Sequence, residues 1–214
     1  MGVVLVLLWL GAVLGLALGA RRRWPDQPEW SRKLLHIGTG PVVLIAWATG
    51  IDRWIALPAA AVVTLLAALN HRYRLLPAIE DVGRHSYGTV AYGAAITLLL
   101  ALFWPAQPQA VAAGVLVMAL GDGFAGLLGP LIPSPSWQIL GQRKSVMGTT
   151  AMAGTALLVL LLLRQQQGAG PGPGALLLIS LVATLLEQLA VLGLDNLTVP
   201  VVTGLLWSWL ALRP

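Results

Sequence analysis

Residues 109–128 read QAVAAGVLVMALGDGFAGLL, and this stretch decides the fold class. It is twenty residues long and carries a single charge, at Asp122. A helix of about 20 apolar residues crosses the hydrocarbon core of a bilayer. A charged side chain inside such a helix costs about 2.5–3.5 kcal/mol on insertion scales, so it is retained mainly for function. The stretch therefore predicts a membrane-spanning helix that carries chemistry at Asp122.

The rest of the chain has the same character. Of 214 residues, 57% are hydrophobic and 10% are charged, and the mean hydropathy is +0.82. Soluble domains carry about 25% charged residues. Eight apolar runs recur between breaks: Val3–Gly19, Leu34–Thr49, Trp54–Leu69, Gly88–Phe103, Gln109–Leu128, Gly148–Leu163, Gly174–Leu192 and Leu197–Leu212. We predict an all-α, polytopic integral membrane protein with seven to eight transmembrane helices in one domain, residues 1–214; the shortest runs leave room for one re-entrant segment.

The basic residues predict how these helices are oriented. Ten of the thirteen Lys and Arg residues lie in the first, third and fifth loops: Arg21, Arg22, Arg23, Arg32, Lys33, Arg72, Arg74, Arg84, Arg143 and Lys144. The other three are Arg53, Arg164 and Arg213. Positive loops stay in the cytoplasm, so we expect the odd loops inside and the N-terminus outside. Residues 164–174, rich in Gln, Gly and Pro, are expected to form a flexible loop outside.

The first run is predicted to be a retained anchor helix, residues 1–20, because its arginines follow the apolar stretch rather than precede it. Gly11, Gly15 and Gly19 share one face of this helix, which predicts close packing against another helix. No internal repeat is detectable, which argues against a transporter built from inverted halves.

Two further bulk features exclude whole classes of function. The chain has no cysteine, which excludes disulfides, zinc–thiolate sites and cysteine nucleophiles. Its net charge is +5 and its isoelectric point is about 10.5, but the basic residues sit in short loops between apolar runs. Membrane topology accounts for that placement, so no nucleic-acid partner is expected.

Three ionisable side chains lie within or at the ends of predicted spans: Asp122, Glu187 and His36. All three fall toward the predicted cytoplasmic side. His36 could instead cap a helix near the interface, and Glu187 could be the buried partner of a basic residue. Asp122 has glycine on both sides, which allows another backbone or a ligand to approach closely. His71 and His85 fall in a loop and are expected to be solvated.

The fifth loop has the composition of a phosphate site. Arg143 and Lys144 supply positive charge, and Gly141 and Gly148 allow close backbone approach. The helix expected to begin near Gly148 would add N–H donors and a favourable dipole. A basic loop beside a membrane can also be a topology marker alone. Carboxylates at Asp122 and Glu187 would suit Mg²⁺, which binds through one or two carboxylates and substrate phosphates.

These segments resemble the CTP-dependent polyprenol kinases, the group that includes dolichol kinase and phytol kinase. The run from Asp122 through Ala125 to Gly129, followed by the stretch from Arg143 to Gly148, resembles their cytidine-nucleotide motif. This sequence departs from that motif at Met147, where the family has Glu, and at Pro133, where a glycine often stands.

Three more segments carry the resemblance, which covers residues 32–200. Arg32-Lys33-x-x-His36 is similar to a segment near the start of these enzymes. The segments Ser86–Thr89 and Gly193–Pro200, the latter containing Asp195 and Asn196, look most like the phytol kinase branch.

The resemblance implies transfer of the γ-phosphate of CTP to the hydroxyl of a membrane isoprenoid alcohol such as phytol, giving a prenyl phosphate and CDP. The catalytic residues implied are Asp122, His36 as candidate general base, and Lys33. The nucleotide-binding residues implied are Arg32, Ala125, Gly129, Gly141, Arg143, Lys144, Ser145 and Gly148. Ser86, Tyr87, Asp195 and Asn196 would form the rim, and Asp122 and Glu187 would hold Mg²⁺. Membrane lipid, the alcohol in the bilayer and CTP from the cytoplasm are the expected partners.

Other activities fit part of the same pattern. A kinase for dolichol, farnesol or diacylglycerol differs only in its acceptor. A cytidylyltransferase would add CMP to a lipid phosphate, so the mass of the product separates it from a kinase. A small transporter or scaffold subunit should spread its polar residues across the bilayer, whereas here they gather on one side.

Overall fold

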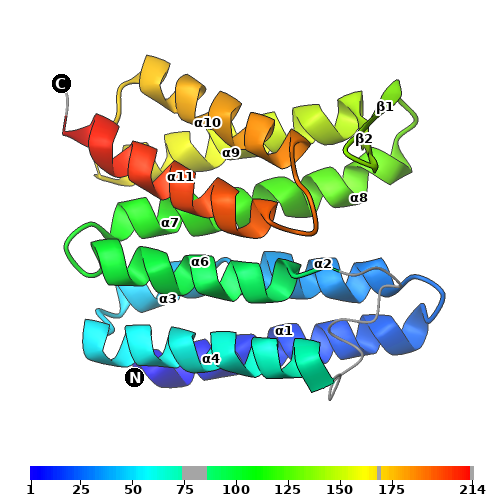
Figure 1. The fold of residues 1–214 in the computed structure, drawn as a ribbon. Helices are drawn as coiled ribbons and strands as arrows, with labels where there is room; N and C mark the ends of the chain where they lie inside the picture. The colour runs from blue at the N-terminus through cyan, green and yellow to red at the C-terminus, as the bar shows by residue number, and fades with distance from the viewer. Residues whose placement is uncertain (74–85, 168–169, 213–214) are drawn as a thin grey trace.

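The chain is built almost entirely of helices that run roughly along one common axis (Figure 1). A computed structural model describes residues 1–73, 86–167 and 170–212. The first half contains α1 (Gly2–Arg23), α2 (Pro28–Thr39), α3 (Val42–Ala48), α4 (Arg53–Tyr73) and α6 (Gly88–Phe103). The second half contains α7 (Pro108–Leu116), the π-helix η1 (Val117–Asp122), α8 (Gly123–Leu131), β1 (Ser136–Ile139), β2 (Gln142–Ser145), α9 (Val146–Gln167), α10 (Pro173–Gln188) and α11 (Asp195–Ala211).

Helix length and composition support a membrane protein. In the described part of the chain, four helical segments are long and apolar enough to cross a bilayer: α1, α4, the continuous segment Pro108–Leu131 and α9. The helices α6 and α10 are apolar but shorter. The prediction of a mostly helical membrane protein is confirmed, and the count of eight spans stays a prediction.

The predicted second span, Leu34–Thr49, is two helices rather than one. The helix α2 ends at Thr39 and α3 begins at Val42. Pro41 lies between them, and proline lacks the N–H that would continue the helical hydrogen bonding. Because α2 begins at Pro28, His36 lies in its third turn and not in the first turn of a span.

The predicted fifth span, Gln109–Leu128, extends to Leu131 and contains a π turn. The backbone changes from α to π at Val117 and returns to α after Asp122. Gly121 and Gly123 weaken the α preference there. Single π turns inside α-helices are frequent at functional sites, and this one ends on the charged residue of the segment.

Residues 136–145 are a local exception to the helical architecture, because they form a two-stranded antiparallel hairpin, β1–β2. Its register pairs Gln138 with Arg143. Leu140 (φ 50°) and Gly141 (φ 77°) make the two-residue turn, and positive φ at both positions is typical of a type I′ hairpin turn. The hairpin lies at the end of the bundle where α8 ends and α9 begins (Figure 1).

Two smaller expectations also change. A Cβ atom added at Gly11, Gly15 or Gly19 would meet none of the described residues within 4 Å, so the expected packing of this face of α1 against another described helix is wrong. The expected loop at residues 164–174 is shorter, because α9 continues through Gln167. Arg74, Arg84, His85, Arg213 and residues 168–169 of that loop lie outside the described residues.

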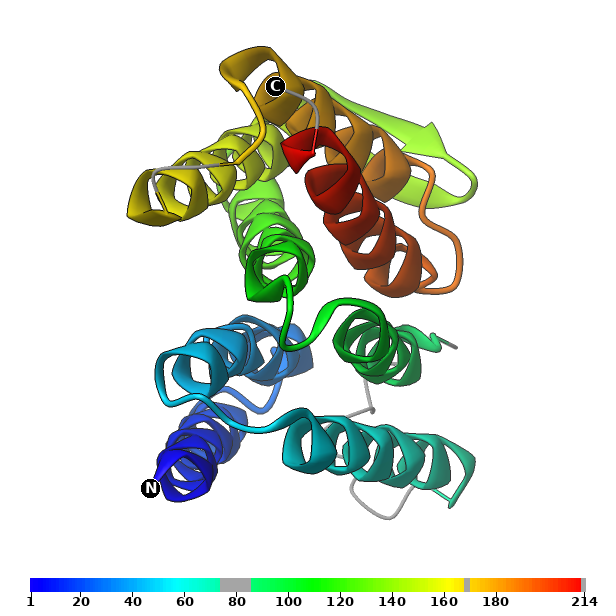
Figure 2. The ribbon, with the colours of Figure 1, turned by 90° about the vertical axis from the view of Figure 1, so that its left-hand side faces the viewer.

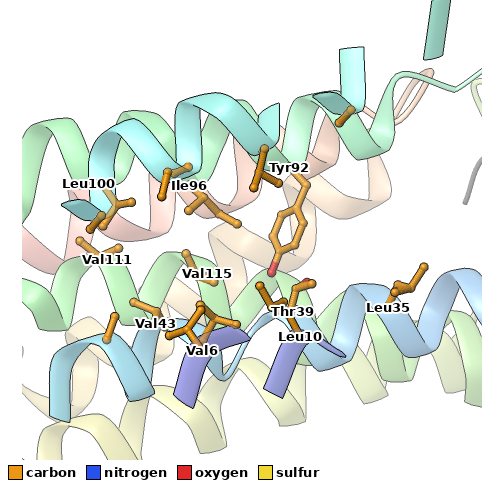
Figure 3. Close-up of a pocket in the computed structure, with 18 of the residues that line it drawn as sticks. Val6, Leu10, Leu35, Thr39, Val43, Tyr92, Ile96, Leu100, Val111 and Val115 are labelled. Carbon is orange, nitrogen blue, oxygen red and sulfur yellow. The ribbon is translucent and has the colours of Figure 1, made fainter. Parts of the chain in front are cut away.

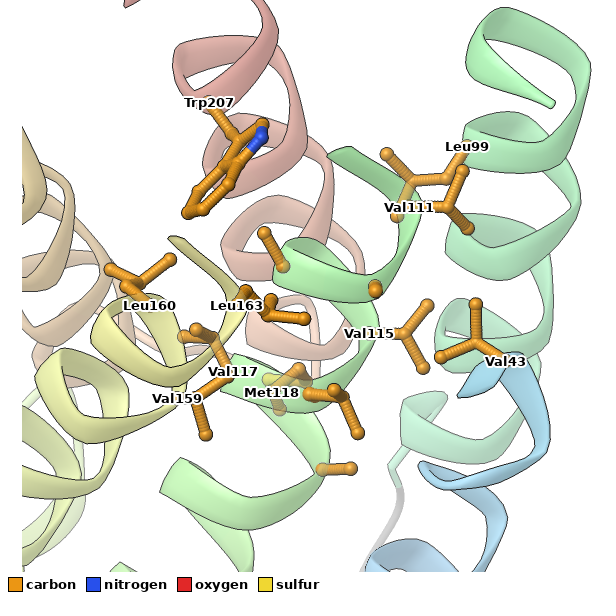
Figure 4. Packing of buried hydrophobic residues seen from close by; sticks show 14 of the residues in the cluster. Val43, Leu99, Val111, Val115, Val117, Met118, Val159, Leu160, Leu163 and Trp207 are labelled. Carbon is orange, nitrogen blue, oxygen red and sulfur yellow. The ribbon is translucent and has the colours of Figure 1, made fainter. Parts of the chain in front are cut away.

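The helix formed by α7 and η1 is the centre of the bundle. Its residues Val111, Val115, Val117 and Met118 are 0–1% exposed. Helices α3, α6, α9 and α11 surround it, and their side chains converge on it in Figure 4. Figure 2, viewed along the axis, shows α1 and α4 on the outside of this arrangement. Because α7 and η1 are buried along their length, the position of Asp122, the last residue of η1, is fixed at one end of the core.

Candidate active site

The first part of the site is a buried cluster of three ionisable groups from α2 and η1. The amino group of Lys33 lies 2.6 Å from Oδ2 of Asp122 and also donates to the Asp122 carbonyl oxygen at 3.0 Å. Nε2 of His36 lies 3.4 Å from the same Oδ2. The side chains of Lys33 and His36 are 7% and 8% exposed, and that of Asp122 is 15% exposed. All three predicted catalytic residues therefore meet at one place.

Glycines of the Asp122 motif make this meeting possible. A Cβ atom at Gly126 would overlap the end of the Lys33 side chain, and one at Gly123 would overlap Ile37. On the other side of the helix, a Cβ atom at Gly121 would lie 2.5 Å from the sulfur of Met152. The motif is glycine-rich because α2 and α9 both press against it.

The hydrogen bonding of His36 fixes which of its nitrogens carries the proton when the ring is neutral. Nε2 lies 3.2 Å from the carbonyl oxygen of Met118, and a carbonyl oxygen only accepts hydrogen bonds. Nε2 must therefore donate, and Nδ1 keeps its lone pair. A base whose N–H is held by a backbone carbonyl, with a carboxylate nearby, is oriented to accept a proton at its other nitrogen.

The second part of the site is an ion pair between the hairpin and α10. Lys144, on β2, forms a salt bridge with Glu187 and donates to the Glu187 carbonyl oxygen at 2.7 Å. The amide of Gln188 donates to the other carboxylate oxygen of Glu187 at 2.9 Å and to the hydroxyl of Thr149 at 3.0 Å. Glu187 is thus the partner of a basic residue, which was one of the two interpretations of its position.

Asp195 connects the two parts electrostatically. It is the first residue of α11, ahead of the apolar stretch that begins at Leu197, and it is 8% exposed. Burial raises the pKa of its carboxyl to about 6, the negative charge of Asp122 adds to the rise, and Lys144 opposes it. Asn196 donates to Asp195 at 3.3 Å. The charges of both ion pairs therefore act on one carboxyl group.

The N-terminus of α9 is closed by hydrogen bonds within the chain. The N–H of Val146 donates to the carbonyl of Pro135, that of Met147 to the hydroxyl of Ser134, and that of Gly148 to the hydroxyl of Ser145. These three N–H groups are therefore not free to bind a phosphate, as the expected phosphate cradle at this helix start would require. The helix begins at Val146, two residues before the predicted start.

The small residues of the nucleotide motif pack α8 against α9. A Cβ atom at Gly129 would lie 3.2 Å from the Ser145 hydroxyl, and one at Gly148 would lie 3.4 Å from the Ala125 carbonyl oxygen. These contacts bring α8, which follows Asp122, beside the hairpin that carries Lys144. The two parts of the site can therefore lie at the same end of the bundle.

Other predicted site residues lie nearer the surface. Arg143 is exposed and donates to Ser136 at 3.2 Å, and Gly141 is exposed in the hairpin turn. Arg32 forms a salt bridge with Glu29 at 2.7 Å.

The rim residues Ser86 and Tyr87 hold the start of α6 against the connection between α10 and α11. The N–H of Tyr87 donates to the Leu192 carbonyl at 2.9 Å, and Ser86 accepts from the N–H of Gly88 at 3.2 Å. The ring of Tyr87 lies 4.8 Å from the ring of His71, centroid to centroid, so His71 belongs to this rim.

The carboxylates do not form a ready-made metal cage. Among the described residues, no three His, Cys, Asp or Glu side chains group as metal ligands. Both carboxylate oxygens of Glu187 are hydrogen bonded, to Lys144 and Gln188. A nucleotide-bound Mg²⁺ needs only one or two protein carboxylates, because phosphates and water complete its shell. Asp122 would fit that role while Lys33 holds one of its oxygens, whereas Glu187 has both oxygens engaged and would fit it only after releasing Lys144.

An apolar cavity of about 380 Å³ adjoins the first cluster (Figure 3). Helices α1, α2, α3, α4, α6 and α7 line it, and His36, Arg32 and Asn196 stand at one end. Tyr92 of α6 projects into it near Thr39 (Figure 3). Tyr92 was not predicted, because a tyrosine in an apolar run has the same sequence pattern as a core or interfacial residue.

The comparisons with known proteins identify the family of the chain. No protein-family model matches the chain, and no solved structure matches it. A curated phytol kinase from Synechocystis sp. is 37% identical over 204 residues, which cover 94% of this chain and 87% of that protein. Identity at that level across nearly the whole length places this chain in the polyprenol and phytol kinase family.

Proposed function

We propose that this protein phosphorylates an isoprenoid alcohol of the phytol type, with CTP as the phosphate donor. The observation that carries the proposal is the position of the cluster of Lys33, His36 and Asp122 at the polar end of an apolar cavity. A lipid kinase needs such a junction, because its acceptor is hydrocarbon with one hydroxyl and its donor is a polyanion. The family membership supports the same reaction class.

The phosphates of the nucleotide are proposed to bind between the two buried lysines, with Arg32 and Arg143 at the outer edge. Lys33 and Lys144 are each neutralised by a carboxylate, so their positions are fixed before the nucleotide arrives. Phosphoryl transfer depends mainly on such positioning and on neutralising charge in a water-poor site. Asp195 interacts electrostatically with both lysines, and Asn196 donates to Asp195, so the two residues would shape the nucleotide side of the site.

The acceptor step follows from the orientation of His36. The alcohol oxygen forms a bond to the γ-phosphorus, and the bond from that phosphorus to the bridging oxygen breaks, so that CDP leaves with the electron pair. The hydroxyl proton passes to Nδ1 of His36, while the Met118 carbonyl holds Nε2–H and the nearby Asp122 carboxylate stabilises the imidazolium that forms. The products are a prenyl monophosphate and CDP.

Magnesium is proposed as the cofactor, with Asp122 as the protein ligand. When bound, it would neutralise negative charge on the phosphates and on the leaving nucleotide. Glu187, the second predicted ligand, would join only if the nucleotide drew Lys144 away from it.

The deciding experiment supplies isolated membranes with CTP, ATP, GTP or UTP and with phytol, farnesol, dolichol or diacylglycerol. We expect phytyl phosphate and CDP from the pairing of CTP with phytol, identified by product mass. A product heavier by CMP would instead establish a cytidylyltransferase. Movement of solute without nucleotide consumption would establish a transporter.

We also propose that the end of the bundle that carries the hairpin faces the cytoplasm and that the N-terminus lies outside. The end of α1, the start of α2 and the hairpin all lie at that end in Figure 1. The last turn of α1 and the strand β2 both carry basic residues. Cytosolic CTP would then reach the lysines directly.

A further inference from the structure

We propose that the apolar cavity binds the hydrocarbon chain of the acceptor alcohol, which enters sideways from the bilayer between α1 and α4, and that the Tyr92 hydroxyl binds the alcohol oxygen. This inference rests on the proposed kinase function and specifies its acceptor site.

The first argument is the distribution of polarity along the cavity. Its polar lining residues are Arg32, His36, Thr39, Thr89, Tyr92 and Asn196. These belong to the last turns of α2, the first turns of α6 and the first turn of α11, which meet at the end of the bundle that holds Asp122. The opposite end is lined by aliphatic side chains, among them Val3, Ile51 and Leu100. One polar end and one long apolar body match a molecule with a single hydroxyl on a hydrocarbon chain.

The second argument is length. The cavity follows α6 from Gly88 to Leu100, and it follows α4 from Ala67 to Ile55. Twelve residues at a rise of 1.5 Å correspond to about 18 Å in each case. Half of a bilayer's hydrocarbon core is about 15 Å thick. The cavity therefore suits an alcohol about as long as one leaflet is deep, whereas a dolichol chain would extend beyond its far end.

The third argument is exposure toward lipid. Several residues that line the cavity are also exposed on the outside of the bundle: Leu7 of α1 is 62% exposed, and Val63 and Ile55 of α4 are 58% and 50% exposed. The helix α1 packs on α2 and α3, whereas α4 packs on α6. The cavity lies between the group of α1, α2 and α3 and the pair of α4 and α6, and its rim is apolar. An alcohol dissolved in the bilayer can enter there without crossing water.

The fourth argument is the Tyr92 hydroxyl. Tyr92 is 7% exposed, and within the described ranges its hydroxyl makes no hydrogen bond of full geometry; its one polar neighbour is a weak contact with the Thr39 hydroxyl. Thr39, beside it in Figure 3, donates its own proton to the His36 carbonyl oxygen at 3.0 Å, so it can only accept from Tyr92 and leaves the Tyr92 oxygen without a donor. A buried hydroxyl without a partner costs about 1–3 kcal/mol. The alcohol oxygen would supply the missing partner.

Tyr92 is also placed to orient the acceptor toward the base. Its ring lies 4.7 Å from the ring of His36, centroid to centroid. A hydrogen bond from Tyr92 to the alcohol oxygen would therefore hold that oxygen beside the imidazole. Because lipid tails are as apolar as the cavity wall, entry gains little hydrophobic free energy. Selection among alcohols would depend on shape and on this one polar contact.

The test uses the full-length protein in membranes and a phytol analogue that carries an aliphatic diazirine in its chain. Photolysis without nucleotide should label α1, α4 and α6 residues of the cavity, and excess phytol should compete. Labelling of α9 or α10 instead would overturn the proposal. The labelling needs no catalysis, so its result is independent of the kinase assay. If the cavity is labelled but the protein phosphorylates no alcohol, the proposed function is refuted and the cavity proposal is not.

Two matched pairs of variants complete the test. Ile96→Trp fills the cavity, whereas Leu98→Trp places the same ring on the exposed face of the same helix. We expect Ile96→Trp to abolish labelling and to raise the KM for phytol without changing the KM for CTP. Tyr92→Phe should lower kcat/KM for phytol about 2- to 10-fold, the range for one hydrogen bond, with Tyr73→Phe, an exposed tyrosine, as its control. Unchanged phytol kinetics in Ile96→Trp, with kinase activity intact, would refute the cavity alone.

Discussion

The amino group of Lys33 and the carboxylate of Asp122 lie 2.6 Å apart, although 89 residues separate them in the chain. The pair joins α2 to the end of η1 and is almost entirely buried. Removing one member of a buried pair leaves an unpaired charge, which costs about 3–5 kcal/mol, whereas replacing both can be nearly neutral. Stability and catalysis can therefore be separated at this pair.

Asp122→Asn should abolish phosphorylation and also lower the thermal stability of the protein in detergent, because Lys33 loses its counter-charge. The double variant Lys33→Met with Asp122→Leu should recover most of that stability and remain inactive. Thermal unfolding and the phytol assay on the same preparations check both statements. Activity in the stable double variant would remove the pair from the mechanism.

Gly126→Ala should push the Lys33 side chain away from Asp122, because the added Cβ overlaps the end of that side chain. Small displacements in an active site can cost about 100-fold in rate, and we expect a kcat loss approaching that size. Gly154→Ala in α9 is the matched control, since a Cβ atom there meets nothing within 4 Å. A helix gains up to about 1 kcal/mol from that change. Equal activity in the two variants would contradict the packing argument.

Lys144→Met should raise the KM for CTP about 10- to 100-fold, the equivalent of one charged hydrogen bond at about 1.5–3 kcal/mol. The KM for phytol should not change, because Lys144 does not line the apolar cavity. Steady-state kinetics with each substrate varied in turn measure the difference. A rise confined to the alcohol would place the nucleotide elsewhere.

Asp195→Asn should stabilise the protein at pH 7.5. The pKa of this carboxyl is raised to about 6 by burial, so folding of the protein is favoured when Asp195 is protonated and neutral. Its contribution to folding is fully present below the unfolded pKa of about 3.9 and is lost as the pH rises through about 6. The advantage of the amide should therefore be on the order of 2 kcal/mol at pH 7.5 and vanish near pH 4. Melting curves of both proteins across that range provide the measurement.

Cysteine labelling tests the orientation cleanly, because the chain contains no cysteine of its own. Gln138→Cys, in the hairpin, should react with an impermeant maleimide only after the cells are permeabilised. Ala106→Cys, in the turn between α6 and α7 at the opposite end, should react in intact cells. The reverse pattern would invert the proposed topology.

The helices and the charged positions could be predicted from the sequence because their signals are local. Asp122 is conspicuous as one carboxylate in an apolar run, and the predicted helix Gly88–Phe103 matches α6 residue for residue. The break at Pro41 also had a local signal, although the uniform hydropathy of Leu34–Thr49 concealed it. The hairpin was missed because its strands are four residues long and lie in a polar loop.

The pairings within the site could not be predicted, because they depend on contacts between distant segments. Nothing near Lys144 in the sequence indicates that Glu187 neutralises it, and nothing near Tyr92 indicates that its ring is buried beside that of His36. The π turn at Val117–Asp122 had only the glycines at 121 and 123 as a signal. Chemistry-bearing residue types were therefore predictable, whereas their partners required the fold.

The rim formed by Leu7, Ile55 and Val63 has a consequence for turnover. Since these residues leave the cavity open along its side, the reacted molecule can return to the leaflet by diffusing in two dimensions, with its new phosphate moving only as far as the lipid headgroups. Its tail never has to be lifted out of the membrane, which would cost about 0.8 kcal/mol for each methylene. Product release is then set by how quickly the phosphate separates from the lysines.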